Sequence, residues 1–175
     1  MGPSPLGSSM PVSKRSTRSR GTPQPHRTRR LFLPLARSDA EKVILRCRLE
    51  FEAIRQGRAD RANLDQMAST LLLIRYLTEA GHGLLPLPFF YETELMLFDA
   101  MEVYMRDGTP VVPGPLVERL VAAVNEYDRQ LRETRLQAVI DASRKLDAYI
   151  ARIKASLAER TSSAEPDPEE TDAGD

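Results

Sequence analysis

The chain has 175 residues, of which 41% are hydrophobic, and its 25 basic and 25 acidic residues give a formal net charge of zero. This length and composition suffice for one domain with a hydrophobic core. A single cysteine, Cys47, excludes an intramolecular disulfide and a metal site built from several cysteines. No apolar run approaches the roughly 18–20 residues that a membrane-spanning helix needs, so we expect no membrane span.

Residues 1–30 form a basic segment that is rich in Ser, Pro and Arg and contains no acidic residue. Such a composition buries too little apolar surface to offset the entropy of ordering, and it predicts a disordered tail. Clustered arginines can neutralise phosphates, so this tail is a candidate arm for DNA or RNA. The alternatives are a solubilising tail, a targeting tail, or a tail that pairs with the acidic C-terminal end. The candidate nucleic-acid-binding residues are Lys14, Arg15, Arg18, Arg20, Arg27, Arg29 and Arg30.

A first helix is predicted between Ser38 and Gly57. Ser38 followed by Glu41 has the pattern of an N-terminal capping box, and Gly57 is typical of the residue that follows a helix. Apolar residues between these ends recur every three or four positions, as on one face of a helix. They are Ile44, Cys47, Phe51 and Ile54.

A second helix is predicted from Asp60, a favourable N-cap residue, to about Gly81. The link at residues 57–59 is short, so the first two helices should form an antiparallel hairpin. The apolar face of the second helix contains Leu64, Met67, Leu71 and Ile74, and Leu72, Leu73 and Leu77 widen it.

The loop at residues 81–88 is too apolar to be fully solvated, and we expect it to lie across the core. A third helix should run from Pro88 or Phe89 to Arg106 or Asp107. Apolar residues occur on most of its sides, which indicates burial either at the centre of the molecule or at an oligomer interface. These residues are Phe90, Leu95, Leu97, Phe98, Met101, Tyr104 and Met105.

Pro115 is suited to the first turn of a fourth helix, which could continue without Gly or Pro to Glu159. Its apolar residues form two seams, and the step between them is not a whole number of heptads. The helix should therefore contain a stutter, rotate its buried face, or break within residues 132–135. The first seam contains Leu120, Val124, Tyr127 and Leu131, and the second contains Val139, Ser143, Leu146, Ile150, Ile153 and Leu157.

The second seam has no evident partner within the chain, so it predicts association with another helix. An apolar seam that extends past the core is typical of helices that pair with a second chain. We therefore expect self-association, or binding to another helical protein, through Val139, Leu146, Ile150, Ile153 and Leu157. Residues 160–175 follow as an acidic tail with two prolines, which should be disordered.

The sequence offers few residues for catalysis or metal binding. His82 is the one candidate acid–base histidine outside the basic tail, and its Gly-His-Gly context is more typical of a helix end. Cys47 lies on an apolar helix face and should be a buried structural thiol. No phosphate-binding loop, nucleophile motif or metal-ligand spacing occurs. We therefore expect no enzymatic activity, no cofactor and no metal.

The chain resembles a group of small helical proteobacterial proteins of unestablished role, sometimes labelled Fis-family transcriptional regulators. The resemblance spans about residues 47–153 and rests on EAIRQG at residues 52–57, on residues 59–65, on EAGHG at residues 79–83 and on VNEYD at residues 124–128. It implies a bacterial, cytoplasmic, helical protein with a regulatory or DNA-associated role. Fis proteins end in a helix-turn-helix, whereas this chain should end in a long amphipathic helix and an acidic tail.

Together these patterns predict an all-α protein, with a four-helix bundle-like core, a long C-terminal helix and disordered termini. The expected organisation is a basic tail at 1–30, a helical domain at 31–159 and an acidic tail at 160–175. The predicted function is that of a non-enzymatic interaction or regulatory protein that self-associates. The alternative is a nucleic-acid-associated transcriptional regulator that uses the basic arm.

Overall fold

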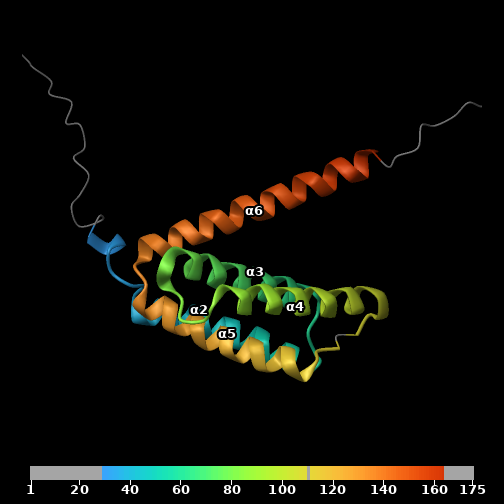
Figure 1. Cartoon of the computed structure of the whole chain (residues 1–175), viewed down its shortest axis with the longest axis horizontal. Helices are drawn as coiled ribbons and strands as arrows, with labels where there is room; N and C mark the ends of the chain where they lie inside the picture. The colour runs from blue at the N-terminus through green and yellow to red at the C-terminus, as the bar shows by residue number, and fades with distance from the viewer. Residues whose placement is uncertain (1–28, 110, 164–175) are drawn as a thin grey trace, which may run out of the picture.

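The computed structural model describes residues 29–109 and 111–163, and it confirms an all-α protein with a long C-terminal helix (Figure 1). The helix α6 continues past the expected domain end at residue 159, so residues 160–163 are helical rather than part of a tail. The elements are α2 (Arg37–Arg55), α3 (Arg61–Leu77), the π-helical turn η1 (Thr78–His82), α4 (Leu87–Asp107), α5 (Gly114–Glu133) and α6 (Leu136–Ser163).

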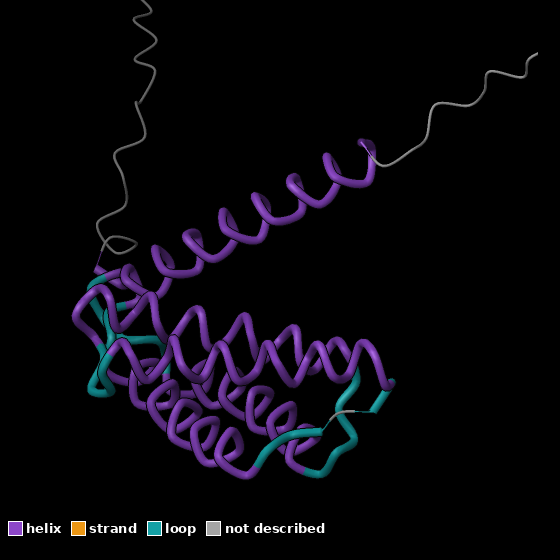
Figure 2. The backbone as a smooth tube through the Cα atoms, turned by 45° about the vertical axis from the view of Figure 1, so that its right-hand side comes forward, coloured by secondary structure: helices purple, strands orange, loops and turns teal. Residues whose placement is uncertain are grey.

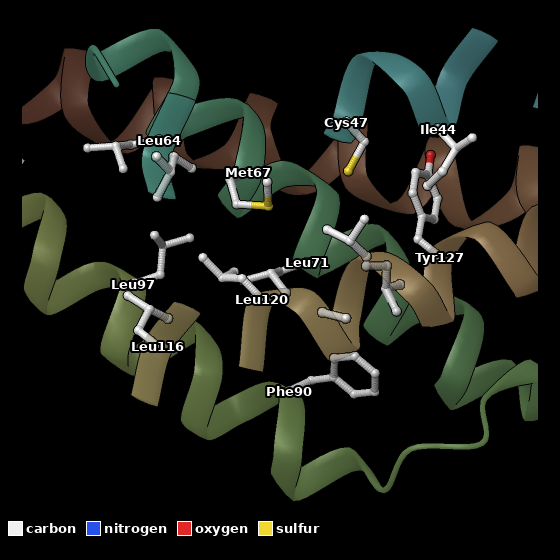
Figure 3. Close-up of a cluster of buried hydrophobic side chains, with 14 of the residues drawn as sticks. Ile44, Cys47, Leu64, Met67, Leu71, Phe90, Leu97, Leu116, Leu120 and Tyr127 are labelled. Atoms are coloured by element: carbon white, nitrogen blue, oxygen red, sulfur yellow. The ribbon is translucent and has the colours of Figure 1, made fainter. Parts of the chain in front are cut away.

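Helix α3 lies at the centre of the molecule and contacts α2, α4, α5 and α6. The apolar faces of α2 to α5 meet in one core, and α6 packs on the side of α3 (Figures 1 and 3). The buried positions follow the predicted spacing, because the core-facing residues of each helix recur every three or four positions. Side chains that are at most 1% exposed include Ile54, Leu64, Met67, Leu71, Ile74, Phe90, Leu97, Leu116, Leu120 and Leu131.

The start of the second predicted helix and the end of the third are where the sequence places them, whereas α4 begins at Leu87, before the predicted Pro88 or Phe89. Asp60 accepts a hydrogen bond from the backbone N–H of Asn63, and the Asn63 side chain accepts one from the N–H of Asp60, which completes a capping box. Gly57 and Gly108 follow helices and Gly81 lies within η1, and all three have φ between 65° and 86°, a conformation that favours glycine.

The predicted N-cap of the first helix is wrong. Helix α2 begins at Arg37 and Ala36 is its N-cap, without a side-chain capping bond, so Ser38 lies inside the helix. A tertiary contact fixes the preceding segment instead: the backbone N–H of Leu136 donates to the carbonyl of Leu33 over 2.8 Å. Pro34 and Arg135 form an isolated β-bridge at the same place. These contacts determine where the chain enters α2, and local capping does not.

The long fourth helix that the sequence allows is broken into α5 and α6, which settles the three alternatives of stutter, rotation and break. Thr134 is the C-cap of α5 and has extended backbone angles (φ −83°, ψ 140°). It is 3% exposed, and its N–H donates to the carbonyl of Gln130 over 2.8 Å. The break turns α6 away from α5 and lays its first turns on α3; toward its C-terminal end α6 diverges from the other helices (Figure 2).

Candidate interaction groove between α4 and α6

A groove of about 270 Å³ opens where α6 begins to diverge from α4, and we call it the α4–α6 groove. Its lining is apolar or aromatic except for Glu94, and it comes from three helices. Residues of α3, α4 and α6 thus meet in a concave apolar surface, the shape and chemistry typical of binding sites. The lining consists of Ala68, Leu72, Glu94, Leu97, Phe98, Met101, Tyr149 and Ile153.

One face of α4 continues the groove outward as a row of exposed side chains. The sequence left open whether α4 is buried centrally or at an oligomer interface; the structure buries Phe90, Thr93, Leu97 and Ala100 and leaves the opposite side uncovered. Leu95, Phe98 and Met105 are 63%, 56% and 61% exposed. We call the following 4-3-4-3 series the outer row: Tyr91, Leu95, Phe98, Glu102 and Met105.

The two halves of α6 have different environments. Val139 and Leu146 pack with Leu73 and the buried Tyr76 of α3, so the expectation that this seam finds no partner within the chain is wrong for its first half. Because the first half of this seam is covered by α3, only the second half remains as a candidate association surface. There Ile153 is 40% and Leu157 is 54% exposed. We call Ile150, Ile153 and Leu157 the distal seam.

A group of ion pairs holds α4 and α6 against α3 beside the groove. Arg75 of α3 donates from Nε to Glu94 Oε1 over 2.7 Å and from Nη1 to Glu79 Oε1 over 2.5 Å. Lys145 of α6 donates to Glu79 Oε2 over 2.5 Å and lies over the ring of Tyr76 at 4.2 Å. Arg75, Glu79 and Glu94 are largely shielded from solvent, which strengthens the pairs that Arg75 forms, whereas Lys145 is 55% exposed and its pair is weaker.

The pKa shifts of this group show which charges the fold stabilises. Burial disfavours the Arg75 cation, but the hydrogen bonds and charges of Glu94 and Glu79 outweigh burial and raise its pKa. At Glu79 burial is outweighed by Lys145 and Arg75, and its pKa falls. At Glu94 burial prevails over Arg75, and the pKa of this groove-lining carboxyl rises.

A second polar network fixes the end of η1, where the candidate His82 lies, and the loop that follows it. Glu126 Oε1 accepts from the backbone N–H of Leu84 over 2.8 Å, and Arg129 donates to the carbonyl of His82 over 2.6 Å. Arg129 also donates to both carboxylate oxygens of Glu126. Burial raises the pKa of Glu126, but Arg129 and Leu84 outweigh it and hold the pKa below its usual value. His82 therefore takes part in this network through its backbone.

Cys47 lies in the core beside Tyr127, as a structural thiol would (Figure 3). Burial, and then the charge of Glu50, raise the pKa of the thiol to about 12, which keeps it protonated at neutral pH. A thiolate is the reactive form of cysteine, so this environment disfavours a nucleophilic role. Within the described residues, no group of three or more His, Cys, Asp or Glu side chains is placed to hold a metal ion.

The candidate nucleic-acid-binding residues lie almost entirely outside the described part of the chain. This applies to Lys14, Arg15, Arg18, Arg20 and Arg27. Arg29 and Arg30 are described, and both are exposed at the point where the chain enters the fold.

The α4–α6 groove is the feature that the sequence did not predict as a site. The sequence did indicate the outer row, because apolar residues occur on most sides of this helix. Packing against the core on one side leaves part of that apolar surface exposed. The position of the groove depends on the angle of α6, which follows from the break at Thr134 and from the contact between Leu33 and Leu136.

Across residues 29–109 and 111–163, every helix is too short or too polar to cross a bilayer. Comparison of the chain with models of protein families, with curated proteins and with solved structures found no match. The resemblance of residues 47–153 to proteins labelled Fis-family regulators therefore stays a prediction.

Proposed function

We propose that this protein is a non-enzymatic interaction protein whose α4–α6 groove receives an amphipathic helix from a protein partner. The observation that carries the proposal is the joining of a concave apolar groove to the exposed apolar side chains of the outer row. Contiguous exposed apolar surface marks interaction sites on soluble proteins. An apolar groove between two helices accepts a third helix through anchors spaced by three and four residues.

The chemistry of the lining favours binding over catalysis. Glu94 is the charged member of the groove, and its carboxylate is engaged with Arg75 at 2.7 Å. The other lining residues provide apolar or aromatic contact surface, with a hydroxyl from Tyr149 and no histidine, cysteine or lysine. Such a surface gains free energy by excluding water from a partner.

The groove is also preorganised. The pairs that Arg75 forms with α4 and Glu79 forms with α6 fix both walls relative to α3 before a partner arrives. Preorganisation lowers the entropic cost of association. Aromatic and methionine side chains such as Phe98 and Met101 are the types enriched at protein interfaces.

Site-specific photo-cross-linking tests this proposal. A photoreactive phenylalanine analogue at Phe98, in the outer row, should form defined adducts with protein in living cells after irradiation. The same analogue at Glu118, an exposed residue of α5, is the matched control and should give far less adduct. Equal adduct patterns at the two positions, or none at either, would contradict a docking site at the groove.

A second candidate function rests on the charge of residues 1–30. This segment carries seven basic residues and no acidic ones, which suits contact with phosphates. The full chain should bind duplex DNA with an affinity that falls steeply as salt is raised. A chain that begins at Arg29 keeps every described residue and should lose most of this binding. Undiminished DNA binding by the shortened chain would exclude the basic segment as an arm.

A further inference from the structure

We infer that the occupant of the α4–α6 groove is residues 149–163 of α6 from a second copy of this chain, docked reciprocally. Each copy would place its distal seam against the outer row of the other, with the two α6 helices antiparallel. This inference rests on the proposed function and names its partner. It is argued from the apolar spacing, the charges and the symmetry of the two surfaces.

The two surfaces have matching helical periods. The outer row of α4 follows a 4-3-4-3 spacing in which Glu102 is the charged member, and Leu146 with the distal seam follows a 4-3-4 spacing. Both are the 3.5-residue period of helices that pack side by side along their length. Leu157 and Met105 follow the groove-lining residues Ile153 and Met101 by four positions on their helices, and both are more than half exposed. A helix that extends along both surfaces would cover them.

The charges of the two surfaces are complementary. Helix α4 has five acidic residues and one basic residue, a net charge of −4. Residues 149–163 have three basic residues and one acidic residue, a net charge of +2. Asp99 and Glu102 are exposed and form no ion pair within the described residues, and the same holds for Lys154 and Arg160. The unpaired acids of one helix thus match the unpaired bases of the other.

Symmetry completes the argument. Every copy has both an outer row and a distal seam. A dimer with one two-fold axis therefore forms two identical contacts and leaves neither surface uncovered in either copy. Closed two-fold dimers are the commonest form of self-association. At 1.5 Å per residue, residues 149–163 are about 22 Å long and α4 is about 32 Å long, so the segment from one copy fits within the length of α4 in the other.

Sedimentation equilibrium of the full chain tests the inference. The mass of one chain is 19.6 kDa, and we expect twice this mass at micromolar concentration. Leu157→Glu should weaken the dimer by at least about tenfold, because it places a carboxylate in the apolar contact twice per dimer. Ala155→Glu, an equal charge change on the opposite side of α6, should not. A wild-type chain that stays monomeric at high micromolar concentration would overturn the inference.

Charge reversal identifies the contact itself. An acidic-α6 variant, Lys154→Glu with Arg160→Glu, and a basic-α4 variant, Asp99→Lys with Glu102→Lys, should each dimerise at least about tenfold more weakly than the wild type. Mixed in equal amounts, the two variants should form a heterodimer, because both of its contacts then join opposite charges. The control variant is Lys42→Glu with Arg58→Glu, which changes the net charge by the same amount as the acidic-α6 variant. Lys42 lies in α2 and Arg58 follows α2, so this variant should leave dimerisation intact.

Two outcomes of these experiments separate the inference from the proposed function. The mixture of the two variants could fail to form a heterodimer, while a single chain that carries all four changes regains dimerisation. This result would show that the charges of α4 and α6 interact within one chain, and it would overturn the inference. Cross-linking of the Phe98 position to a different protein but never to a second copy would also overturn it. In that last case the proposed function would stand, with a different partner.

Discussion

Gly83 illustrates how one residue secures the loop that follows η1. An added Cβ at this position would overlap the side chain of Thr78. The Thr78 hydroxyl donates to the carbonyl of Ile74 over 2.9 Å and accepts from the amide of Gln130 over 3.1 Å. Any group at Gly83 must therefore disturb two hydrogen bonds of the interior.

We predict that Gly83→Ala lowers the free energy of unfolding by about 1–3 kcal/mol, because overpacking forces side chains from their preferred positions. Gly114→Ala is the matched control, since an added Cβ there meets nothing within 4 Å. Denaturant unfolding followed by circular dichroism measures both. Equal stability of the two variants would mean that Thr78 can move without cost.

Glu126 is a buried carboxylate whose charge stabilises the fold. Its interactions with Arg129 and Leu84 lower its pKa, so its contribution is complete above the ordinary value of 4.5 and is lost as pH falls through the lower folded-state pKa. Glu126→Gln should therefore cost about 1–3 kcal/mol at pH 7, and the difference from wild type should narrow below about pH 4.5.

Unfolding experiments between pH 3 and pH 7 measure this effect. Glu118→Gln provides the control, because Glu118 is exposed and forms no ion pair or side-chain hydrogen bond within the described residues. A difference between Glu126→Gln and wild type that stays constant across this range would show that shape, and not charge, determines the role of Glu126.

At the scale of elements, the sequence predicted the helices and their inner faces well. Helix ends can be recognised in a sequence where a capping residue or a glycine marks them. Asp60 is such a capping residue, and Gly57 and Gly81 are such glycines. Ser38 gave the same kind of signal and was wrong, because the contact between Leu33 and Leu136 fixes that helix start from a distance. Local patterns do not contain contacts between segments far apart along the chain.

The candidate site was only partly predictable for the same reason. Ile153 and Leu157 belong to a seam that the sequence identified, and they remain exposed. Val139 and Leu146 belong to the same seam but pack on α3, and no spacing rule distinguishes them from the distal residues. The direction of α6 after Thr134 makes this distinction, and that direction is a property of the tertiary structure.

Truncation tests whether the outer part of α6 serves assembly or folding. A chain that ends at Ala148 keeps the contacts of Ala138, Val139 and Leu146 with α3 and should unfold cooperatively. The same chain should lose dimerisation, while a chain that ends at Ser163 and keeps every described residue of α6 should retain it. Thermal unfolding and sedimentation of both chains give the two readouts. Collapse of the helical signal in the shorter chain would assign these residues to the core.

At the scale of the whole molecule, the fold holds the two ends of the described chain apart. The segment before α2 is bonded to the first residue of α6, and the chain leaves the fold at the far end of that helix (Figure 1). A helix of 28 residues, about 42 Å long, separates these points. In the sequence, five bases and no acid precede Arg29, whereas six acids and no base follow Ser163.

Helix α6 therefore separates the point where a basic segment of the sequence joins the fold from the point where an acidic segment leaves it. Two chains with antiparallel α6 helices would bring the basic attachment point of each chain beside the acidic attachment point of the other, and the dipoles of the two α6 helices would oppose each other. The neutral total charge of the sequence would then be matched by local neutrality along the assembly, with a weaker field at long range.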